Sequence, residues 1–258
     1  MKNKIAKFVK YRPLLNELVA RDVKTKYRRS VLGVFWTVLN PLLMMIVLSI
    51  VFSQLFKFDI DNYPLYLLSG QVVFNFFSAS TTMCMTAIIE NAPLIKKVYV
   101  PKYIFVVSRT VSSAINLMAS LAALIIVMIC TRAELFYTAI LSIIPLISLV
   151  VLCLGVGLIL AAYAVKFRDI VHLYSVFITA FMYLTPVIYP IESLPVWVKR
   201  VVMVNPLTSI LKMFRCFIMY GAMPDLFTTL MTFVPSIVFL VLGLRVFYKQ
   251  QDRFILYV

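Results

Sequence analysis

Hydrophobic residues occupy long runs along the chain, and short charged segments separate these runs. The runs predict six membrane-spanning helices, at residues 31–56, 63–89, 103–130, 135–165, 172–189 and 226–244. A helix needs roughly 20 apolar residues to cross a bilayer, and every run is close to that length or longer. Pro41, inside the first run, predicts a kink. The pattern therefore predicts an all-α polytopic membrane protein.

The segment 90–102 is a short charged break between the second and third spans. Pro93 and Pro101 disfavour helix in the residues that precede them, which favours a short helix or turn between them. Its apolar positions are Leu94, Ile95 and Val98, set against the basic residues Lys96 and Lys97. We interpret this segment as an amphipathic contact through which an external protein moves the membrane spans.

The first 30 residues form a basic segment with an apolar periodicity. They carry ten of the 25 basic residues. Apolar residues recur at helical spacing at Leu14, Leu15, Leu18, Val19, Val23 and Tyr27. A basic amphipathic helix lies in the membrane interface and directs its Lys and Arg side chains to lipid phosphates. We therefore expect residues 1–30 to form a cytoplasmic interfacial helix ahead of a spanning domain, residues 31–258.

The segment 190–224 does not have the pattern of a membrane span. Charged residues interrupt its apolar stretches, and Pro195 and Pro206 break it further. Irregular backbone at membrane depth is tolerated only where protein or a water-lined cavity covers it. We expect short helices here that enter the outer leaflet in part.

Charge and composition set the class and the orientation of the chain. A hydrophobic share of 63% is well above the value of about 45–50% in soluble domains. The net charge of +15 comes from Lys and Arg between the apolar runs, without the aromatic-interleaved patch typical of nucleic-acid binding. With both termini and segment 90–102 in the cytoplasm, 18 basic residues lie inside and six outside. This distribution follows the positive-inside rule.

The placement of reactive residues argues against several activities. The ten acidic residues fall in loops, in termini or at span edges, whereas a gradient-driven carrier usually has an ionisable relay at bilayer depth. A membrane-embedded enzyme or metal site requires a cluster of carboxylates, His or Cys that the pattern does not provide. No glycine precedes a lysine, so the phosphate-cradling G-x-x-x-x-G-K-[ST] motif is absent from the sequence. We also expect no cleavable signal peptide and no metal.

Four segments, in order along the chain, resemble the signatures of a known family. The first is residues 18–42, which include Ala20-Arg21-Asp22 and Asn40-Pro41-Leu42, and the second is residues 94–102. The third is residues 183–190, with the sequence Tyr-Leu-Thr-Pro-Val-Ile-Tyr-Pro, and the fourth is residues 205–208, with the sequence Asn-Pro-Leu-Thr. They are similar to type-2 ATP-binding-cassette (ABC) permeases that export polysaccharides and teichoic acids. The resemblance covers nearly the whole chain and does not specify one glycan.

The resemblance implies a homodimer of six-span subunits in the bacterial inner membrane, above two copies of a separate nucleotide-binding subunit. ATP and Mg²⁺ would bind in that partner, and this chain would hold no cofactor of its own. Segment 90–102 would be the coupling helix, and segment 190–224 would form extracellular gate helices with Pro186, Pro190 and Pro206 at the outer gate. The cargo would be a polyprenyl-diphosphate-linked polysaccharide or teichoic acid.

Two sets of residues are candidates for cargo contact. Clustered cations suit a diphosphate, and the chain offers Lys24, Lys26, Arg28, Arg29 and Arg109. The alternatives are lipid anchoring for the first four, and snorkelling or pairing with Glu90 or Asp169 for Arg109. A glycan path could be lined by a cluster of three aromatic residues and one asparagine, Phe74, Asn75, Phe76 and Phe77. Ordinary packing in the membrane is the alternative for this cluster.

Three other functions compete with polysaccharide export. An exporter of small lipids or drugs from the same superfamily would have the same spans. A glycan-modifying enzyme would need a buried acidic or metal-binding cluster. A gradient-driven flippase would need a titratable relay within the membrane.

Overall fold

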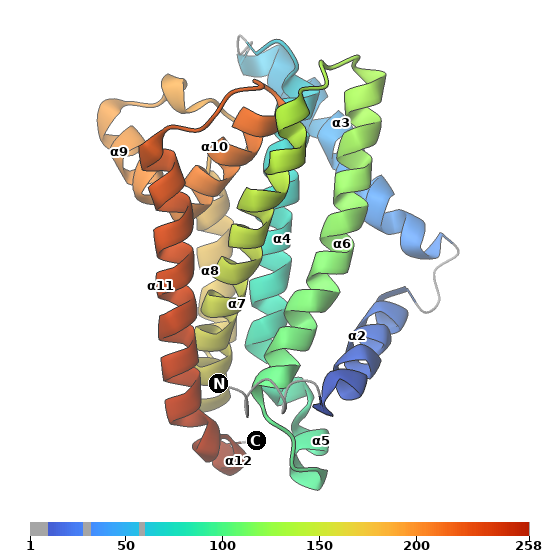
Figure 1. Cartoon of the computed structure of the whole chain (residues 1–258), viewed down its shortest axis with the longest axis vertical. Helices are drawn as coiled ribbons and strands as arrows, with labels where there is room; N and C mark the ends of the chain where they lie inside the picture. Colours follow the sequence, from blue (N-terminus) through green and yellow to red (C-terminus); the bar gives the residue numbers. More distant parts are fainter. Residues whose placement is uncertain (1–9, 28–31, 57–59, 258) are drawn as a thin grey trace.

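The computed structural model describes residues 10–27, 32–56 and 60–257, which form helices and connecting turns and no β-strand. In chain order the longer helices are α2 (Arg12–Tyr27), α3 (Trp36–Phe56), α4 (Tyr63–Glu90), α6 (Tyr103–Cys130), α7 (Ile143–Lys166), α8 (Ile170–Tyr183), α10 (Pro206–Ile218) and α11 (Leu226–Gln250). Short helices are α5 (Ala92–Lys97), α9 (Val196–Val204) and α12 (Phe254–Tyr257). The helices α5 and α12 lie at one end of the molecule, the α5 end, and α9 and α10 lie near the other, the α9 end (Figure 1).

Four of the expected spans are helices of sufficient length and apolarity to cross a bilayer: residues 63–90, 103–130, 137–166 and 226–253. The helices α9 and α10 meet at an angle of 89°, and the pair counts as a fifth candidate if it is taken as one broken span. The apolar parts of α3 and α8 are shorter. The prediction of an all-helical membrane protein is confirmed, with four to five candidate spans.

The helix α8 differs from the predicted fifth span because it ends six residues early, at Tyr183 rather than Tyr189. Its 14 residues rise about 21 Å, less than the roughly 30 Å of a hydrocarbon core. The cause is Pro186, which disfavours helical backbone at Thr185 before it. Residues 184–190 therefore form turns at the α9 end.

The centre of the bundle is α4, which packs against α6 and α7. Its buried face includes Leu67, Leu68 and Val73, none of which has measurable exposure. Gly157 of α7 permits the close approach to α4, because a Cβ atom there would lie 2.6 Å from Cβ of Cys84. Gly157 and the fully buried Ala161 belong to one small-residue stripe, the pattern that allows membrane helices to pack closely.

The helices α7 and α11 make the closest contact between two long helices. A Cβ atom on Gly243 would lie 2.3 Å from the carbonyl oxygen of Gly155, and one on Gly155 would lie 2.5 Å from the backbone nitrogen of Leu240. Ser148 Oγ donates to the carbonyl of Thr232 at 2.9 Å and lies 2.9 Å from Ser236 Oγ. The glycines permit this close approach, and the hydrogen bonds of the serine hydroxyl groups hold α7 and α11 together.

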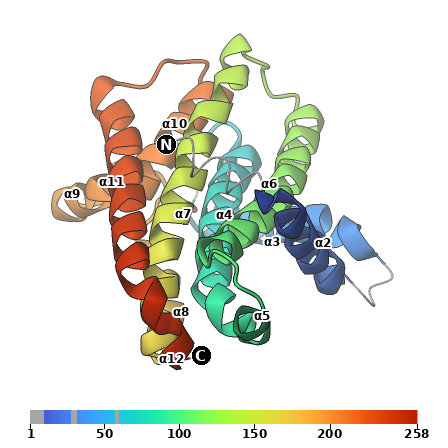
Figure 2. The same ribbon diagram turned by 60° about the horizontal axis from the view of Figure 1, so that its bottom comes forward.

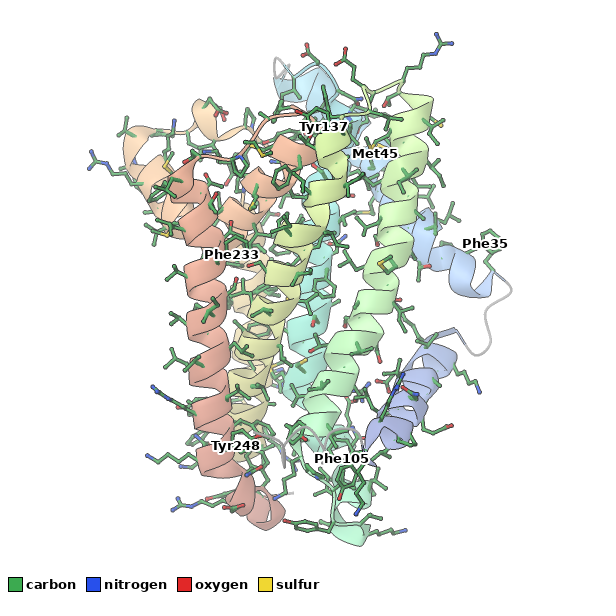
Figure 3. All side chains as sticks on the ribbon, in the orientation of Figure 1. Phe35, Met45, Phe105, Tyr137, Phe233 and Tyr248 are labelled. Carbon is green, nitrogen blue, oxygen red and sulfur yellow. The ribbon has the colours of Figure 1, made fainter. Side chains whose placement is uncertain are left out.

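At the α5 end, a hydrophobic cluster joins segments that are distant in the sequence. It contains Leu18 of α2, Ile95 of α5, Phe105 of α6, Phe247 of α11 and Phe254 of α12. The rings of Phe247 and Phe254 meet edge to face at 5.3 Å. Figure 2 shows α2, α5 and α6 gathered at this end, and Figure 3 shows Phe105 and Tyr248 there. The helix α2, the segment between α4 and α6 and the C-terminal segment therefore share one core.

Candidate functional site

The predicted coupling segment contains a short helix with one buried and one exposed face. The helix α5 spans Ala92–Lys97, with Pro93 in its first turn. Ile95 is buried, and Leu94 packs beside it against the hydrophobic cluster at the α5 end. Lys96 and Lys97 are exposed. The inner face of α5 is therefore fixed to the membrane helices, and its outer face is available for contact.

Val98 differs from its predicted place on the apolar face. It follows the last helical residue with extended backbone, φ −132° and ψ 133°, and its side chain is 50% exposed. Tyr99 beside it is 96% exposed. The helix ends before Val98 because the chain must extend toward Pro101. Val98 and Tyr99 are thus exposed on the surface, next to Lys96 and Lys97.

Asn91 connects α5 to two other helices. Its carbonyl oxygen accepts from the backbone nitrogens of Leu94 and Ile95, which starts α5. Its side-chain nitrogen donates to the carbonyl of Ala87 in α4 at 2.7 Å. Arg21 of α2 donates to its side-chain oxygen at 2.9 Å. The start of α5 is therefore held both by α4, which precedes it, and by α2.

A charged group beside this junction joins α2, α4 and α6. Arg109 Nη1 lies 3.1 Å from Asp22 Oδ1, and Arg109 Nη2 donates to Glu90 Oε2. The Asp22 side chain is only 4% exposed, and the other oxygen of its carboxylate accepts from Ser112 at 3.2 Å. Glu90 is half exposed. We call Asp22, Arg109 and Glu90 the ionic bridge.

The ionic bridge was predicted only in part. Pairing of Arg109 with Glu90 is confirmed, whereas the pairs of Arg109 in the structure do not include Asp169. Asp22 was read as a terminal acid outside the membrane. The available signal was its spacing, because Asp22 stands one helical turn after the buried Leu18 and so shares its face. A carboxylate on a buried face requires a partner.

Two cavities open beside the ionic bridge. One, of about 550 Å³, is lined by Asp22, Glu90, Arg109 and Ser112. The second, of about 500 Å³, lies between α3, α4 and α6 and is lined by Trp36, Gln71, Asn75, Phe76 and Ser120 among others. Lys26 and Asn116 line both cavities. The two cavities therefore follow one flank of the molecule, from the α5 end into the bundle.

The structure separates the residues proposed for cargo contact. Lys24 and Lys26 are exposed on α2, and Lys26 lines the cavities. Arg28 and Arg29 lie outside the described residues. Phe74, Phe76 and Phe77 are all about 5% exposed and belong to the central core, whereas Asn75 is exposed. From this set, Asn75 and Phe76 line the second cavity. Phe77 instead packs its ring 5.6 Å from that of Phe181.

The segments that carry the predicted gate prolines meet at the α9 end. Pro206 is the first residue of α10, and Asn205 before it accepts from the backbone nitrogen of Leu207 at 2.9 Å. The Asn205 side-chain nitrogen lies 3.1 Å from Thr185 Oγ1, next to the buried Pro186. Pro190 stands partly buried at the end of the same segment. Two of the ordered sequence motifs thus contact each other through one asparagine.

Arg215 is a further residue of this region that the sequence did not single out. The sequence places it among the outer cations of segment 190–224, where short helices are expected, and the structure buries it in α10, with 5% exposure. Its guanidinium donates to the carbonyls of Tyr66, Pro186 and Val187 and to Ser69 Oγ, at 2.8–3.1 Å. Its central carbon lies 3.4 Å from the centre of the Tyr66 ring. Arg215 therefore fixes α10 and residues 185–187 to α4.

Comparison with known proteins identifies the family. The sequence matches the ABC-2 type transporter family over residues 13–219. It is 29% identical over 253 residues to the O-antigen export system permease protein RfbA of Myxococcus xanthus, with 97% of each chain covered. It is 27% identical over 243 residues to the protein of the same name in Klebsiella pneumoniae, with 93% of each chain covered. It is also 20% identical over 238 residues to the polysialic acid transport protein KpsM of Escherichia coli, covering 91% of this chain and 92% of that protein. The chain therefore belongs to the ABC-2 type transporter family, a family of membrane permeases.

Proposed function

We propose that this chain is the membrane subunit of an ATP-driven exporter of lipid-linked polysaccharide. Two copies would form the channel, and two copies of a separate ATPase would bind at the α5 end and hold the ATP and Mg²⁺. The observation that carries the proposal is α5, a short helix anchored on one side and exposed on the other. Near full-length similarity to O-antigen permeases supports polysaccharide as the cargo class.

The contacts around α5 suggest how movement of the ATPase would be transmitted to the channel. Lys96, Lys97, Val98 and Tyr99 would touch the ATPase, while Leu94 and Ile95 transmit its movement to the cluster behind them. Asn91 and the ionic bridge tie the same junction to α2. A displacement of α5 would therefore move α2 and open the cavities beside it. The membrane domain would have six spans, with α9 and α10 as the outer gate.

The cavities suggest a path for the cargo. Lys24 and Lys26, with Arg28 and Arg29 farther along the chain, would receive the diphosphate at the cytoplasmic mouth, because clustered cations bind phosphate oxygens well. Arg109 already faces two carboxylates, so its proposed part is to hold α2 in place. Asn75, Phe76 and Trp36 would contact the sugars along the second cavity.

The decisive experiment alters only the exposed lysines of α5 and the two exposed residues that follow it. The variant Lys96→Ser, Lys97→Ser, Val98→Ser, Tyr99→Ser leaves Leu94 and Ile95 in the core. We expect it to insert normally, to lose copurification with its ATPase, and to lose most of the polymer-stimulated ATP turnover of the wild-type complex. The matched control is Lys199→Ser, Arg200→Ser in α9, at the opposite end, which should copurify as wild type does.

Normal ATPase binding and export by the α5 variant would refute the proposed coupling. The cargo class is tested separately, by ATP turnover of the wild-type complex with lipid-linked polysaccharide, lipid-linked teichoic acid or hydrophobic drugs. Stimulation by polysaccharide supports the proposal. Stimulation by drugs or small lipids alone would make the chain an exporter of small lipids or drugs, and the proposed role of α5 would still hold.

A further inference from the structure

A third cavity lies on the opposite flank from the two beside α2, between the ends of α7, α11 and α12. It has a volume of about 370 Å³. Figures 1 and 2 both place α11 and α2 on opposite sides of the bundle. The cavity therefore lies away from the proposed cargo path.

The rim of this cavity is strongly basic. Three cations line it, Lys166 of α7, Lys249 of α11 and Arg253, and no carboxylate does. Within the described residues, none of the three makes an ion pair with Asp or Glu. The nearby acids Asp169 and Asp252 are exposed and do not line the cavity. Among the residues that the structure describes, the cavity thus carries concentrated positive charge and no carboxylate lines it.

The depth of the cavity corresponds to lipid head groups. Lys166 is the last residue of α7, with 24 residues, and Lys249 is the second-last of α11, with 25. Helices of this length rise about 36–37 Å, several ångströms more than a hydrocarbon core of about 30 Å. Tyr163, Phe167 and Tyr257 stand partly exposed around the cavity, as aromatic residues do at the membrane interface.

The floor of the cavity is apolar and firmly anchored. It includes Phe254, which is 2% exposed and packs on Phe247. Lys102, just before α6, donates to the carbonyl of Gln251 and lies 5.6 Å from the Phe254 ring centre. Burial lowers the pKa of Lys102, and Asp252 opposes that shift in part. The turn that carries Arg253 is therefore fixed to the chain that leaves α5.

We propose that this cavity is a binding site for the phosphate head group of an anionic membrane phospholipid. The cations would contact the phosphate oxygens, and the aromatic side chains would lie at the glycerol level. The acyl chains would lie against the apolar lining of the cavity, which includes Ala162, Val165 and Val246. Basic pockets between membrane helices bind cardiolipin and similar head groups in this way. Three cations favour the doubly charged cardiolipin over singly charged phosphatidylglycerol.

The test is native mass spectrometry of the full-length, delipidated permease with added cardiolipin, phosphatidylglycerol or phosphatidylcholine. We expect one saturable high-affinity cardiolipin per chain, weaker phosphatidylglycerol binding, and no retained phosphatidylcholine. Each cation near a membrane surface contributes about a fivefold factor, so Lys166→Gln, Lys249→Gln, Arg253→Gln should weaken cardiolipin binding roughly 100-fold. Inorganic phosphate at millimolar concentration should not displace the lipid, because it has no acyl chains to contact the apolar lining of the cavity.

The matched control removes three exposed cations that do not line the cavity, Arg168→Gln, Arg200→Gln and Arg245→Gln. It should bind cardiolipin as wild type does. The single variant Lys249→Glu, with a thermal transition measured in the same detergent, keeps the test valid if the triple variant is unstable. Equal cardiolipin affinity in wild type and the cavity variants, or an equal loss in the control, would overturn the site. Preferential retention of a polyprenyl diphosphate would also overturn it, because the cavity would then belong to the cargo.

Discussion

Asp22 and Arg109 illustrate how a single buried ion pair determines the position of a whole helix. Their side chains are 4% and 11% exposed, and each has a second polar partner, Ser112 for Asp22 and Glu90 for Arg109. Charges at this depth are costly unless they are paired and hydrogen-bonded. The pair therefore specifies where α2 lies against α6, more than it adds to overall stability.

Loss of Arg109 from the buried pair should lower the free energy of unfolding more than loss of the charge of Glu90, the exposed member of the ionic bridge. We expect Arg109→Ala to destabilise the protein by about 3 kcal/mol, because the buried Asp22 carboxylate then keeps only the half-exposed Arg21, at 3.3 Å, as its cation. Glu90→Gln should cost about 1 kcal/mol or less, since Glu90 is half exposed. Thermal unfolding in detergent, followed by size-exclusion chromatography, measures both. Similar shifts for the two variants would contradict this ranking, and the exchange Asp22→Arg, Arg109→Asp should recover part of the loss.

Arg215 leads to a second prediction at this scale. Loss of its guanidinium in Arg215→Ala removes a donor from three carbonyls and from Ser69 Oγ, although the Tyr66 carbonyl keeps the Ser69 hydroxyl as a donor. The cost is about 1–3 kcal/mol for each buried group that stays unsatisfied. Arg215→Lys should recover only part of the folded yield, because an ammonium lacks the planar fork. Lys212→Ala in the same helix is the control, since the pair of Lys212 with Asp225 is about half exposed. Comparable yields for all three variants would show that Arg215 does not fix α10.

At the scale of elements, sequence reasoning was most accurate where apolar character alone decides the structure. The third span was predicted at residues 103–130, and α6 has those bounds. The end of α8 was missed because the local effect of Pro186 outweighs the apolar character of Val187 and Ile188. The pairing of Arg109 with Asp22 and the partners of Arg215 were missed for another reason. Both depend on helices distant in the sequence, and no local pattern encodes which helix faces which.

The contact between α7 and α11 gives a prediction for a helix pair. In Gly243→Ala, the new Cβ atom would lie 2.3 Å from a backbone oxygen, so the two helices must separate. We expect a loss of about 1–3 kcal/mol or more, and a matching fall in the monodisperse fraction after detergent extraction. Gly33→Ala is the steric control, because nothing lies within 4 Å of the added atom; only its positive φ of 49° adds strain. Wild-type behaviour of Gly243→Ala would show that the helices are not held this closely.

At the scale of the whole molecule, the two ends differ in charge and in the chemistry proposed for them. The α5 end carries Lys96 and Lys97 in the last turn of α5 and the basic cavity with Lys166 and Lys249. The α9 end carries the bent helix pair and the segments around Pro186 and Pro206. Cytoplasmic segments of membrane proteins are rich in Lys and Arg, so this asymmetry favours the α5 end as the cytoplasmic one. That is also the side on which ATP is available to a partner subunit.

Cysteine labelling tests this orientation directly. Tyr99 and Tyr137 are 96% and 84% exposed and lie at the α5 end and the α9 end respectively, as Figure 3 shows for Tyr137. Cys130 and Cys216 are accessible at least in part and would be replaced by Ser, whereas Cys84 and Cys153 are buried. In spheroplasts, a membrane-impermeant maleimide should label Tyr137→Cys at once and Tyr99→Cys only after permeabilisation. The reverse pattern would place α5 outside the cell, where no ATPase could reach it, and both the coupling proposal and the inward orientation would fail together.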